Sequence, residues 1–403
     1  MDLKKLNNNQ KAAVEAVDKP VLIFAGAGSG KTRVLTFKIF YLIKKGIVKP
    51  EEILAVTFTN KAAEVMKQRV AALLKNNVQD MNIGTFHSIC AKLLRNEISH
   101  LGFSKNFAIY DRTDQISLIK IIMAEINVSK NSVMPKTVRN KISFYKSQLI
   151  DPKSAMKAVN TIQDKIIIDI YKYYNNSLKE NNAVDFDDLL NFPLEIFNNH
   201  SRILSKYQKL WKYILVDEYQ DTNKAQFLLV KMLAEKHRNI CVVGDDDQSI
   251  YGWRGADIRN ILDFEKDFPE CETFTLENNY RSTNQIVQAA QSVVRNNTDR
   301  VNKNLLSVKG EGDLIGVIET HDEMEEADAV INALQKEIKM KKRTFNDFSV
   351  LYRTNAQSRA LEDSFRRSAI PYKIIGGTRF YERKEVKDVL GYLRLIVNIE
   401  DTI

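Results

Sequence analysis

Five short segments carry residue types that could handle a nucleoside triphosphate, and they follow one another in a fixed order. They are Ala25 to Thr32, Gly84 to His87, Val216 to Gln220, Gly244 to Gln248, and Asn279 to Ser282. The first is rich in glycine and ends in Lys-Thr, whereas the third closes an apolar run with Asp-Glu. Taken together, the five segments predict that the chain binds a nucleoside triphosphate with Mg²⁺ and couples it to movement on nucleic acid.

The glycine-rich segment is typical of a phosphate-binding loop between a strand and a helix. Glycines let backbone N–H groups approach phosphate oxygens, and the helix N-terminus adds partial positive charge. Lys31 would reach the β- and γ-phosphates, and the Thr32 hydroxyl would ligate Mg²⁺. The expected nucleotide contacts from this loop are Ala25, Gly26, Ala27, Gly28, Ser29, Gly30, Lys31 and Thr32. The first position is alanine, where the motif usually has glycine.

Two further segments carry candidate catalytic groups at the ends of apolar runs. Asp217 would hold Mg²⁺, directly or through water, and Glu218 would polarise the attacking water. A capping Asp-Glu pair is the alternative. Gln248 could touch the γ-phosphate or that water without titrating, although an isolated glutamine is usually a surface residue.

Gln10 and Arg281 are weaker candidates. The Gln10 amide could read an adenine edge, or it could be an ordinary residue on a surface helix. Arg281 is a candidate arginine finger, because a guanidinium at the join of two lobes can reach a γ-phosphate. The alternative is a salt bridge from Arg281 to Glu277 or another acid.

An aromatic and basic cluster follows Gln248. Tyr251 and Trp253 could stack on single-stranded bases while Arg254 neutralises phosphate. Aromatic residues more often lie in a core, but the neighbouring glycines and serine favour a loop. Phe58, Thr59 and Asn60 also end a strand, where DNA-facing loops of a parallel sheet would lie.

The trio Asp185, Asp187 and Asp188 could bind a metal, and helix capping is the preferred interpretation.

Short apolar runs alternate with helical patterns in two parts of the chain. The expected strands are 21–24, 53–58 and 81–84, then 213–216, 239–243 and 271–276. Such runs between helices predict a parallel sheet covered on both faces. From about 109 to about 200 no strand is expected, and this stretch is interpreted as an inserted helical lobe. Seven lysines and arginines between Lys130 and Lys157 could form one basic face for a partner, or they could be the ordinary solvent-exposed side of a helix.

A second α/β lobe is expected after the first. Its strands would be 314–319, 348–352 and 372–375, and a helical pattern runs over 386–397 to the end at Ile403 without a capping signal. The expected domains are 1–108 and 201–280 for the first lobe, 109–200 for the insertion, and 281–403 for a partial second lobe.

Composition agrees with a polyanionic partner without requiring one. The net charge is +9, which suits nucleic-acid binding. Proteins rich in lysine, asparagine and isoleucine, however, can be this basic without binding nucleic acid. No apolar run is long enough for a membrane span, and the N-terminus lacks a signal-peptide core. The three cysteines are far apart and form no CxxC pair, so neither a zinc ribbon nor a disulfide framework is expected. A reducing cytoplasm is the simplest location.

The motifs together are similar to those of a known protein family. The chain resembles the UvrD/PcrA/Rep group of superfamily 1 DNA helicases in the residues and the order of its motifs. Besides the glycine-rich loop, the matching segments are Leu6 to Gln10, Phe58 to Ala63, Gly84 to Ser88, Val216 to Thr222, Val243 to Ala256, and Asn279 to Thr283. The run Leu351 to Arg359 looks like the next motif of that group. The resemblance spans nearly the whole chain.

The resemblance implies an α/β, RecA-like P-loop NTPase sheet with a helical insertion, and a partial second RecA-like lobe. It implies ATP and Mg²⁺ as cofactors, and 3′ to 5′ translocation on single-stranded DNA in repair or replication, with the insertion touching duplex at junctions. Gln10 would read adenine, and Arg33 and Tyr280 would flank the base. Lys31, Thr32, Asp217, Glu218, Gln248 and Arg281 would handle phosphates, Mg²⁺ and water. The implied DNA contacts are Phe58, Asn60, His87, Tyr251, Trp253, Arg254 and Asn355.

Two later motifs of the group's second lobe have no counterpart here, and neither does its second large accessory domain. The chain is therefore expected to be an N-terminal portion of a helicase. The alternative is a module that binds ATP and single-stranded DNA, or docks on a partner, without translocating. A helicase–nuclease subunit would need a nuclease segment that this sequence lacks.

Overall fold

Six apolar runs form one parallel sheet, as the sequence predicts. The strands are β1 (Val21–Ala25), β2 (Ile53–Thr57), β3 (Asn82–Thr85), β6 (Tyr213–Val216), β7 (Ile240–Gly244) and β8 (Glu272–Leu276). Their order across the sheet is β3-β2-β6-β7-β1-β8, and each neighbouring pair is parallel. The computed structural model describes residues 3–75, 78, 80–129, 132–159, 161–298, 300–375 and 384–398.

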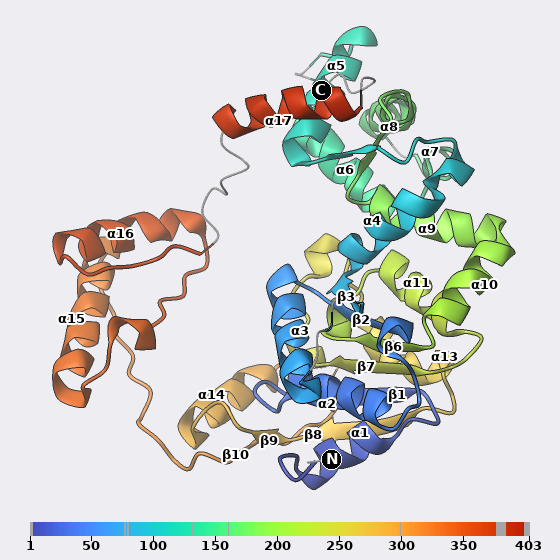
Figure 1. Ribbon diagram of the computed structural model, residues 1–403. Helices are drawn as coiled ribbons and strands as arrows, with labels where there is room; N and C mark the ends of the chain where they lie inside the picture. The colour runs from blue at the N-terminus through green and yellow to red at the C-terminus, as the bar shows by residue number, and fades with distance from the viewer. Residues whose placement is uncertain are drawn as a thin grey trace. The chain divides into compact units, whose positions relative to one another are not determined.

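Helices cover both faces of this sheet, because successive strand residues point to opposite sides. In β1, Leu22 and Phe24 belong to one core, whereas Val21, Ile23 and Ala25 belong to the other. The second core is closed by α1 (Asn8–Glu15), α2 (Lys31–Lys44) and α3 (Asn60–Leu74). The first is closed by α4 (Phe86–Glu97), α9 (Asp188–Asn199), α10 (Ser201–Leu210), α11 (Lys224–Ala234), α12 (Arg259–Leu262) and α13 (Phe264–Asp267) (Figure 1).

A mainly helical segment is inserted between β3 and β6 and has its own core. It contains α5 (Arg112–Glu125), α6 (Pro135–Ser147), α7 (Pro152–Met156) and α8 (Ile162–Glu180). The expectation of no strand here was wrong, because β4 (Ala108–Tyr110) pairs in parallel with β5 (Ala183–Asp185). Strands of three residues are too short to show a period of two in the sequence. The core of the insertion ends at Ala183, and α9 already packs on the sheet.

Not all the basic residues of the insertion are exposed, so the seven cannot together form one basic face. Lys146 is buried between Asp185 and Asp188. Arg139 donates a hydrogen bond to Gln115, and Lys141 pairs with Asp164. The exposed ones in the described part are Lys136, Lys153 and Lys157, while Lys130 lies outside the described residues.

The chain leaves the sheet through a small second ladder. Strand β9 (Asn278–Asn279) pairs in parallel with β10 (Leu306–Ser307), and α14 (Asn284–Val294) lies between them in sequence. Short 3₁₀ turns punctuate the connections, at Pro50–Glu52, Ile98–Leu101, Tyr219–Asp221, Asp246–Gln248, Gly252–Arg254, Phe345–Asp347 and Asn355–Gln357. All of this up to residue 312, with 391–403, forms one compact unit.

Residues 313–390 form a second unit with a small core. Helices α15 (Glu323–Lys341) and α16 (Ser358–Arg367) pack around Ile331, Leu334, Phe365 and Ile370. The strands expected over 314–319, 348–352 and 372–375 were wrong, since these described residues form no strand. The helical pattern over 386–397 is confirmed by α17 (Lys384–Val397).

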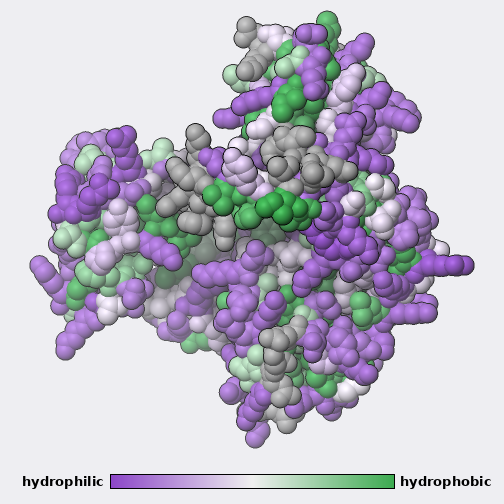
Figure 2. Space-filling model, turned by 45° about the horizontal axis from the view of Figure 1, so that its top comes forward, coloured by the Kyte–Doolittle hydropathy of each residue, from purple (hydrophilic) through white to green (hydrophobic). Residues whose placement is uncertain are grey.

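The missing strands leave apolar side chains uncovered. Leu314, Val317 and Leu351 are 85%, 92% and 92% exposed. An extended run becomes a strand only with backbone partners on its edges and cover on its faces. None of these runs pairs with a strand among the described residues, and only Phe348 and Val350 pack against the small core. Figure 2 shows such apolar residues at the surface among mostly hydrophilic ones. Among the described residues, no helix combines the length and apolarity needed to cross a bilayer.

Candidate functional site

The glycine-rich loop leaves β1 and turns into α2 at the carboxyl edge of the sheet. Gly28 and Gly30 have φ values of 72° and 96°, a left-handed backbone that glycine adopts without strain. Ser29 closes the turn by donating from Oγ to the Gly26 carbonyl at 2.7 Å. A Cβ on Gly28 would lie 2.7 Å from Cβ of Arg281, so the loop is shaped by close approach as well as by φ.

Lys31 begins α2 with a buried ammonium that has room for another acceptor. Its Nζ lies 3.3 Å from Oε2 of Glu218, an ion-pair distance. The same atom is buried without a hydrogen-bond partner among the described residues. Because an unsatisfied buried ammonium is costly, this arrangement fits a phosphate oxygen arriving at the loop.

Thr32 and Asp217 form the oxygen pair that the sequence predicts for Mg²⁺. The Thr32 hydroxyl donates to Oδ2 of Asp217 at 3.4 Å, although the two residues are far apart in sequence. Burial and the nearby Glu218 charge raise the pKa of Asp217 to about 7. A divalent cation would offset both effects, and hydroxyl and carboxylate oxygens are ligands that Mg²⁺ prefers.

Glu218 follows Asp217 in a backbone conformation unusual for a side-chain-bearing residue. Its φ is 51°, in the left-handed region, and such positions concentrate at functional sites. The Gln220 amide ties this residue to the next strand end: Nε2 donates to Oε2 of Glu218 at 3.0 Å. Its Oε1 accepts from the backbone N–H of Asp245 at 2.9 Å.

Gln248 lies in the 3₁₀ turn after β7, and its Nε2 donates to Oδ2 of Asp245 at 2.5 Å. Asp245, Asp246 and Asp247 have carboxylate oxygens close enough together to hold a metal ion. Lys303 already brings its ammonium to all three, so the cluster has an internal cation. The Mg²⁺ candidates therefore remain Thr32 and Asp217.

The residues expected around the base gather beside the N-terminal segment. Gln10 is buried, accepts at Oε1 from the Asn7 backbone, and donates from Nε2 to the Ser29 carbonyl at 2.9 Å. Arg33 donates to the Lys5 carbonyl at 2.6 Å. The hydroxyl of Tyr280 accepts from Asn7 at 2.7 Å. Gln10 is thus part of a capping box that supports the phosphate loop, a role that the sequence reading missed.

Arg281 is held by its backbone rather than by its side chain. Its N–H donates to Oδ1 of Asn279 at 2.9 Å, and Nδ2 of Asn279 donates to the Ala27 carbonyl at 2.6 Å. The expected alternative, an ion pair with Glu277, does not occur, since Glu277 accepts instead from the backbone of Asn304. Within the described part of the chain, the exposed Arg281 guanidinium has no ion pair.

The aromatic and basic cluster is a surface feature, as the loop composition predicts. Phe58 stacks on Tyr251 with ring centroids 4.8 Å apart. Trp253 is 75% exposed, and the Arg254 guanidinium lies 4.6 Å from its ring centroid. Aromatic faces combined with a guanidinium suit stacked bases and their phosphates. Asn60 is exposed at the start of α3, close in sequence to Phe58.

His87 has an aromatic neighbour that the sequence reading missed. The rings of His87 and Phe186 lie edge to face with centroids 5.8 Å apart, and Phe186 is 45% exposed. Burial lowers the pKa of His87, which favours a neutral ring. Phe186 stands directly after β5, at the return from the insertion, and this position was its only signal in the sequence. Asn355 is exposed in the second unit.

Two members of the aspartate trio, Asp185 and Asp188, cap the return to the sheet, as preferred from the sequence. Asp187 makes no capping hydrogen bond and accepts instead from Oγ of Ser143 at 2.7 Å. The backbone N–H of Asp188 donates to Oδ1 of Asp185 at 2.9 Å, and Asp185 donates back to Oδ2 of Asp188 at 3.2 Å. Lys146 donates to Asp185 and Asp188 at 2.8 and 2.7 Å, which accounts for their charge without a metal.

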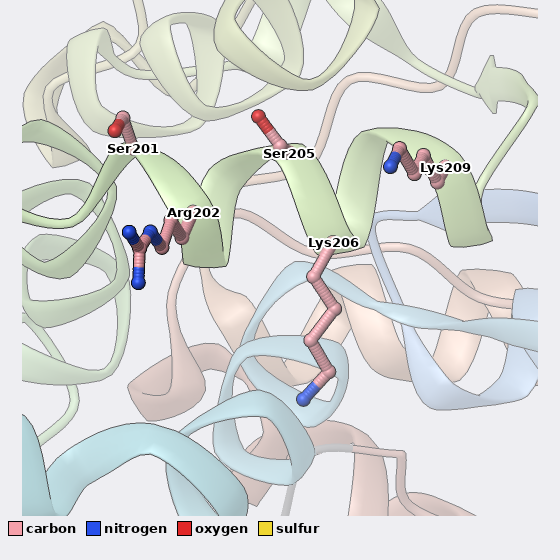
Figure 3. Close-up of a pocket in the computed structure, with 5 residues that line it drawn as sticks. All are labelled: Ser201, Arg202, Ser205, Lys206 and Lys209. Carbon is pink, nitrogen blue, oxygen red and sulfur yellow. The ribbon is translucent and has the colours of Figure 1, made fainter.

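A shallow depression lies along α10, outside these loops. It is lined by Ser201, Arg202, Ser205, Lys206 and Lys209 (Figure 3). Lys206 reaches Oε1 of Glu97 at 2.6 Å. The described lining residues all come from one helix, and we assign no ligand to the depression.

Two protein-family models match the chain. One, described as the UvrD/REP helicase N-terminal domain, covers residues 6–269. The other, described as the UvrD-like helicase C-terminal domain, covers residues 274–403. Together they span the sheet, the insertion and the second unit.

Curated relatives match along the whole chain. The ATP-dependent DNA helicases PcrA of Staphylococcus epidermidis (strain RP62A) and Bacillus subtilis (strain 168) are 47% and 46% identical over 401 residues. PcrA of Staphylococcus aureus (strain Mu50) is 46% identical. Each match covers 100% of this chain but only 54–55% of the relative. The chain thus spans about half the length of these relatives.

Proposed function

The chain belongs to the UvrD/REP helicase family, and from that premise we propose that it binds ATP with Mg²⁺, binds single-stranded DNA, and hydrolyses ATP as the motor core of a 3′ to 5′ DNA helicase. The observation that carries the proposal is the meeting of Lys31, Thr32, Asp217 and Glu218 at one sheet edge, with an ammonium that awaits an acceptor. The relatives named as helicases add the DNA partner.

The proposed roles follow from the contacts. Lys31 would turn its ammonium to the β- and γ-phosphates, and Thr32 and Asp217 would hold Mg²⁺, which neutralises phosphate charge. Nucleotide binding would draw Lys31 from Glu218, freeing that carboxylate to accept a proton from the attacking water. Gln248 would orient the water or the γ-phosphate.

Other proposed roles concern the base, the transition state and the DNA. Arg33 and Tyr280 would flank adenine, and Gln10 would shape the base pocket from its capping position. Arg281 would place its unpaired guanidinium on the γ-phosphate. Phe58, Asn60, His87, Phe186, Tyr251, Trp253 and Arg254 would contact single-stranded DNA, and Asn355 would add a contact from the second unit. The insertion would face duplex at a single-strand junction.

We further propose a cytoplasmic protein of DNA repair or replication, because the relatives are named as bacterial DNA helicases.

A second candidate is a module that binds ATP and single-stranded DNA without moving along it. One observation favours it: the described part of the second unit contains no strand. A motor needs two lobes that close on the nucleotide, and the second one has little core of its own.

One experiment separates the two candidates. ATP hydrolysis by the 403-residue chain is measured with and without single-stranded DNA, beside the Lys31→Ala and Glu218→Gln variants. Turnover stimulated by DNA and lost in both variants supports the motor. Mg²⁺-dependent ATP binding without turnover, lost in Lys31→Ala and kept in Glu218→Gln, supports the binding module. A chain that binds no ATP contradicts both candidates.

A further inference from the structure

Lys303 is a buried lysine outside every motif, and it contacts three consecutive carboxylates. Its Nζ lies 2.6 Å from Oδ1 of Asp245 and 3.3 Å from Oδ2 of Asp247, and it also donates to Asp246. Its side chain is 1% exposed. Burial lowers the pKa of Lys303, but Asp245 and Asp246 outweigh burial and hold it above its usual value, so the ammonium stays charged.

The residues just before Lys303 bind the same three aspartates, Asp245 to Asp247, which we call the acidic turn. Arg300 forms a bidentate pair with Asp247, through Nε and Nη2 at 2.9 Å each. The backbone N–H of Val301 donates to Oδ2 of Asp246 at 2.7 Å. Bidentate guanidinium pairs are geometrically specific, so these contacts fix orientation as well as neutralise charge.

The residues just after Lys303 reach the phosphate loop. The side chain of Leu305 packs on Gly26 so closely that a Cβ there would lie 2.2 Å from Cδ2 of Leu305. Leu306 and Ser307 form β10 against Asn278 and Asn279. We call residues 300–307 the strap, because this short segment touches the acidic turn, the phosphate loop and β9.

Lys303 and Gln248 share one carboxylate. Oδ1 of Asp245 accepts from Lys303, and Oδ2 accepts from the Gln248 amide. The backbone of the same aspartate donates to Gln220, which donates in turn to Glu218. A carboxylate gripped at one oxygen has its other oxygen fixed in direction, so Lys303 sets where the Gln248 amide points.

We propose that Lys303 is a positioning residue for ATP hydrolysis: through Asp245 it holds Gln248 and the Gln220–Glu218 pair in register with the phosphate loop. This inference rests on the proposed function. In this role Lys303 acts through Asp245 rather than by contacting the nucleotide or the attacking water. Its loss should therefore lower the rate of the chemical step more than the affinity for nucleotide.

The test compares Lys303→Met with the unchanged chain. We expect kcat for ATP to fall about 10- to 100-fold, the scale of a small misplacement of catalytic groups, with KM changed less than about threefold. Lys303→Arg, which keeps the charge, should recover part of kcat. Combined with Gln248→Ala, Lys303→Met should cause a smaller further loss than it causes alone, because part of its effect passes through the same amide.

The matched control is Lys146→Met, which also removes a buried ammonium from a pair of aspartates. It should lower the thermal midpoint comparably and leave the basal kcat without DNA within about twofold, since its cluster does not reach Gln248. Equal kcat losses in Lys303→Met and the control, or full activity of Lys303→Met, would overturn the inference. Arg300→Ala removes the partly exposed Arg300–Asp247 pair and is the second variant if Lys303→Met does not fold. It must also lower kcat.

A second readout does not depend on turnover. Hydrogen exchange of the amides at 245–248 should speed up in Lys303→Met or Arg300→Ala but not in Lys146→Met, because only the strap variants release the acidic turn. If the unchanged chain hydrolyses no ATP, the motor proposal fails. Hydrogen exchange then still tests whether the strap holds the acidic turn in place. Unaltered exchange at 245–248 would overturn the inference in either case.

Discussion

At the scale of single residues, the phosphate loop depends on Gly28 having no side chain. Its φ is 72°, and a Cβ would lie 2.7 Å from Arg281 and 2.8 Å from Asn279. Gly28→Ala should therefore distort the loop and weaken Mg²⁺–ATP binding at least about tenfold, through clash added to left-handed strain. Titration calorimetry with a non-hydrolysable ATP analogue measures the change.

Gly46 supplies a control with the same backbone strain and no clash. Its φ is 69°, and a Cβ there would meet nothing within 4 Å. Gly46→Ala should cost about 1 kcal/mol of stability and leave nucleotide affinity unchanged. Equal affinity losses in the two variants would mean that general destabilisation, not the loop, explains the effect.

Trp253 tests the DNA surface. It is 75% exposed beside Arg254, where stacking on a base would bury it. Trp253→Ala should weaken binding of single-stranded DNA by about 1–3 kcal/mol without changing ATP affinity. Tyr173→Ala, at another exposed aromatic, is the matched control in a fluorescence anisotropy titration. Unaltered DNA affinity in Trp253→Ala would remove this residue from the surface.

The residues found from sequence share one property: their type and their place after a strand both point to chemistry. Lys31, Thr32 and Asp217 meet as expected because parallel strands end at one edge. Lys303 and Phe186 were missed because a lone lysine, or a phenylalanine among aspartates, looks ordinary in the sequence. Their importance comes from contacts across many residues of chain, which no local spacing encodes.

At the scale of elements, long apolar runs were predictable and very short or half-covered ones were not. All six strands of the main sheet lie where the sequence predicts them. The signal is strongest for β1, β2, β6 and β7, which are buried along their whole length. The pair β4 and β5 is too short to show a period. The runs at 314–319 and 348–352 are apolar enough for strands, but pairing depends on neighbours rather than on composition.

The start of α9 gives a pH prediction. Burial, and then the Asp185 charge, raise the pKa of Asp187 to about 6, while Ser143 donates to it and Lys146 and Arg139 oppose the shift. Since an unfolded aspartate titrates near about 3.9, the folded chain binds more protons between about pH 4 and 6. The contribution of Asp187 to the free energy of unfolding should therefore fall as pH rises through that window.

Asp187→Asn separates the titration of Asp187 from that of other groups that also change the stability with pH. The variant keeps an acceptor for Ser143 and cannot titrate, so the stability of the unchanged chain relative to it should decrease by on the order of 2 kcal/mol between pH 4 and pH 7. Urea denaturation at several pH values measures the difference. Parallel pH curves for the two proteins would show that Asp187 titrates normally.

At the scale of the whole molecule, the nucleotide groups all lie in the unit formed by 1–312 and 391–403. The unit of residues 313–390 has a core of four buried residues and exposes many apolar ones. Limited proteolysis should therefore cut first within the second unit, because weakly packed segments open most often. Mass spectrometry of the fragments locates the cuts.

The trimmed product should still bind Mg²⁺–ATP, as measured on the digest before and after cleavage. ATP binding lost in step with the first cut would show that the second unit supports the loop. Lys31→Ala, carried through the same digest, gives the background for binding that does not involve the phosphate loop.

The strand order has a consequence for how the chain is made. β1 pairs only with β7 and β8, which leave the ribosome long after it, whereas β2 and β3 can pair with each other early. The first strand and its loop must wait for distant partners, so translation produces the ATP-binding loop early and completes it late. Ribosome-bound chains stalled before β7 should not be retained on immobilised ATP, and those with β8 released should be. Retention of the shorter chains would mean that the loop takes shape without its sheet.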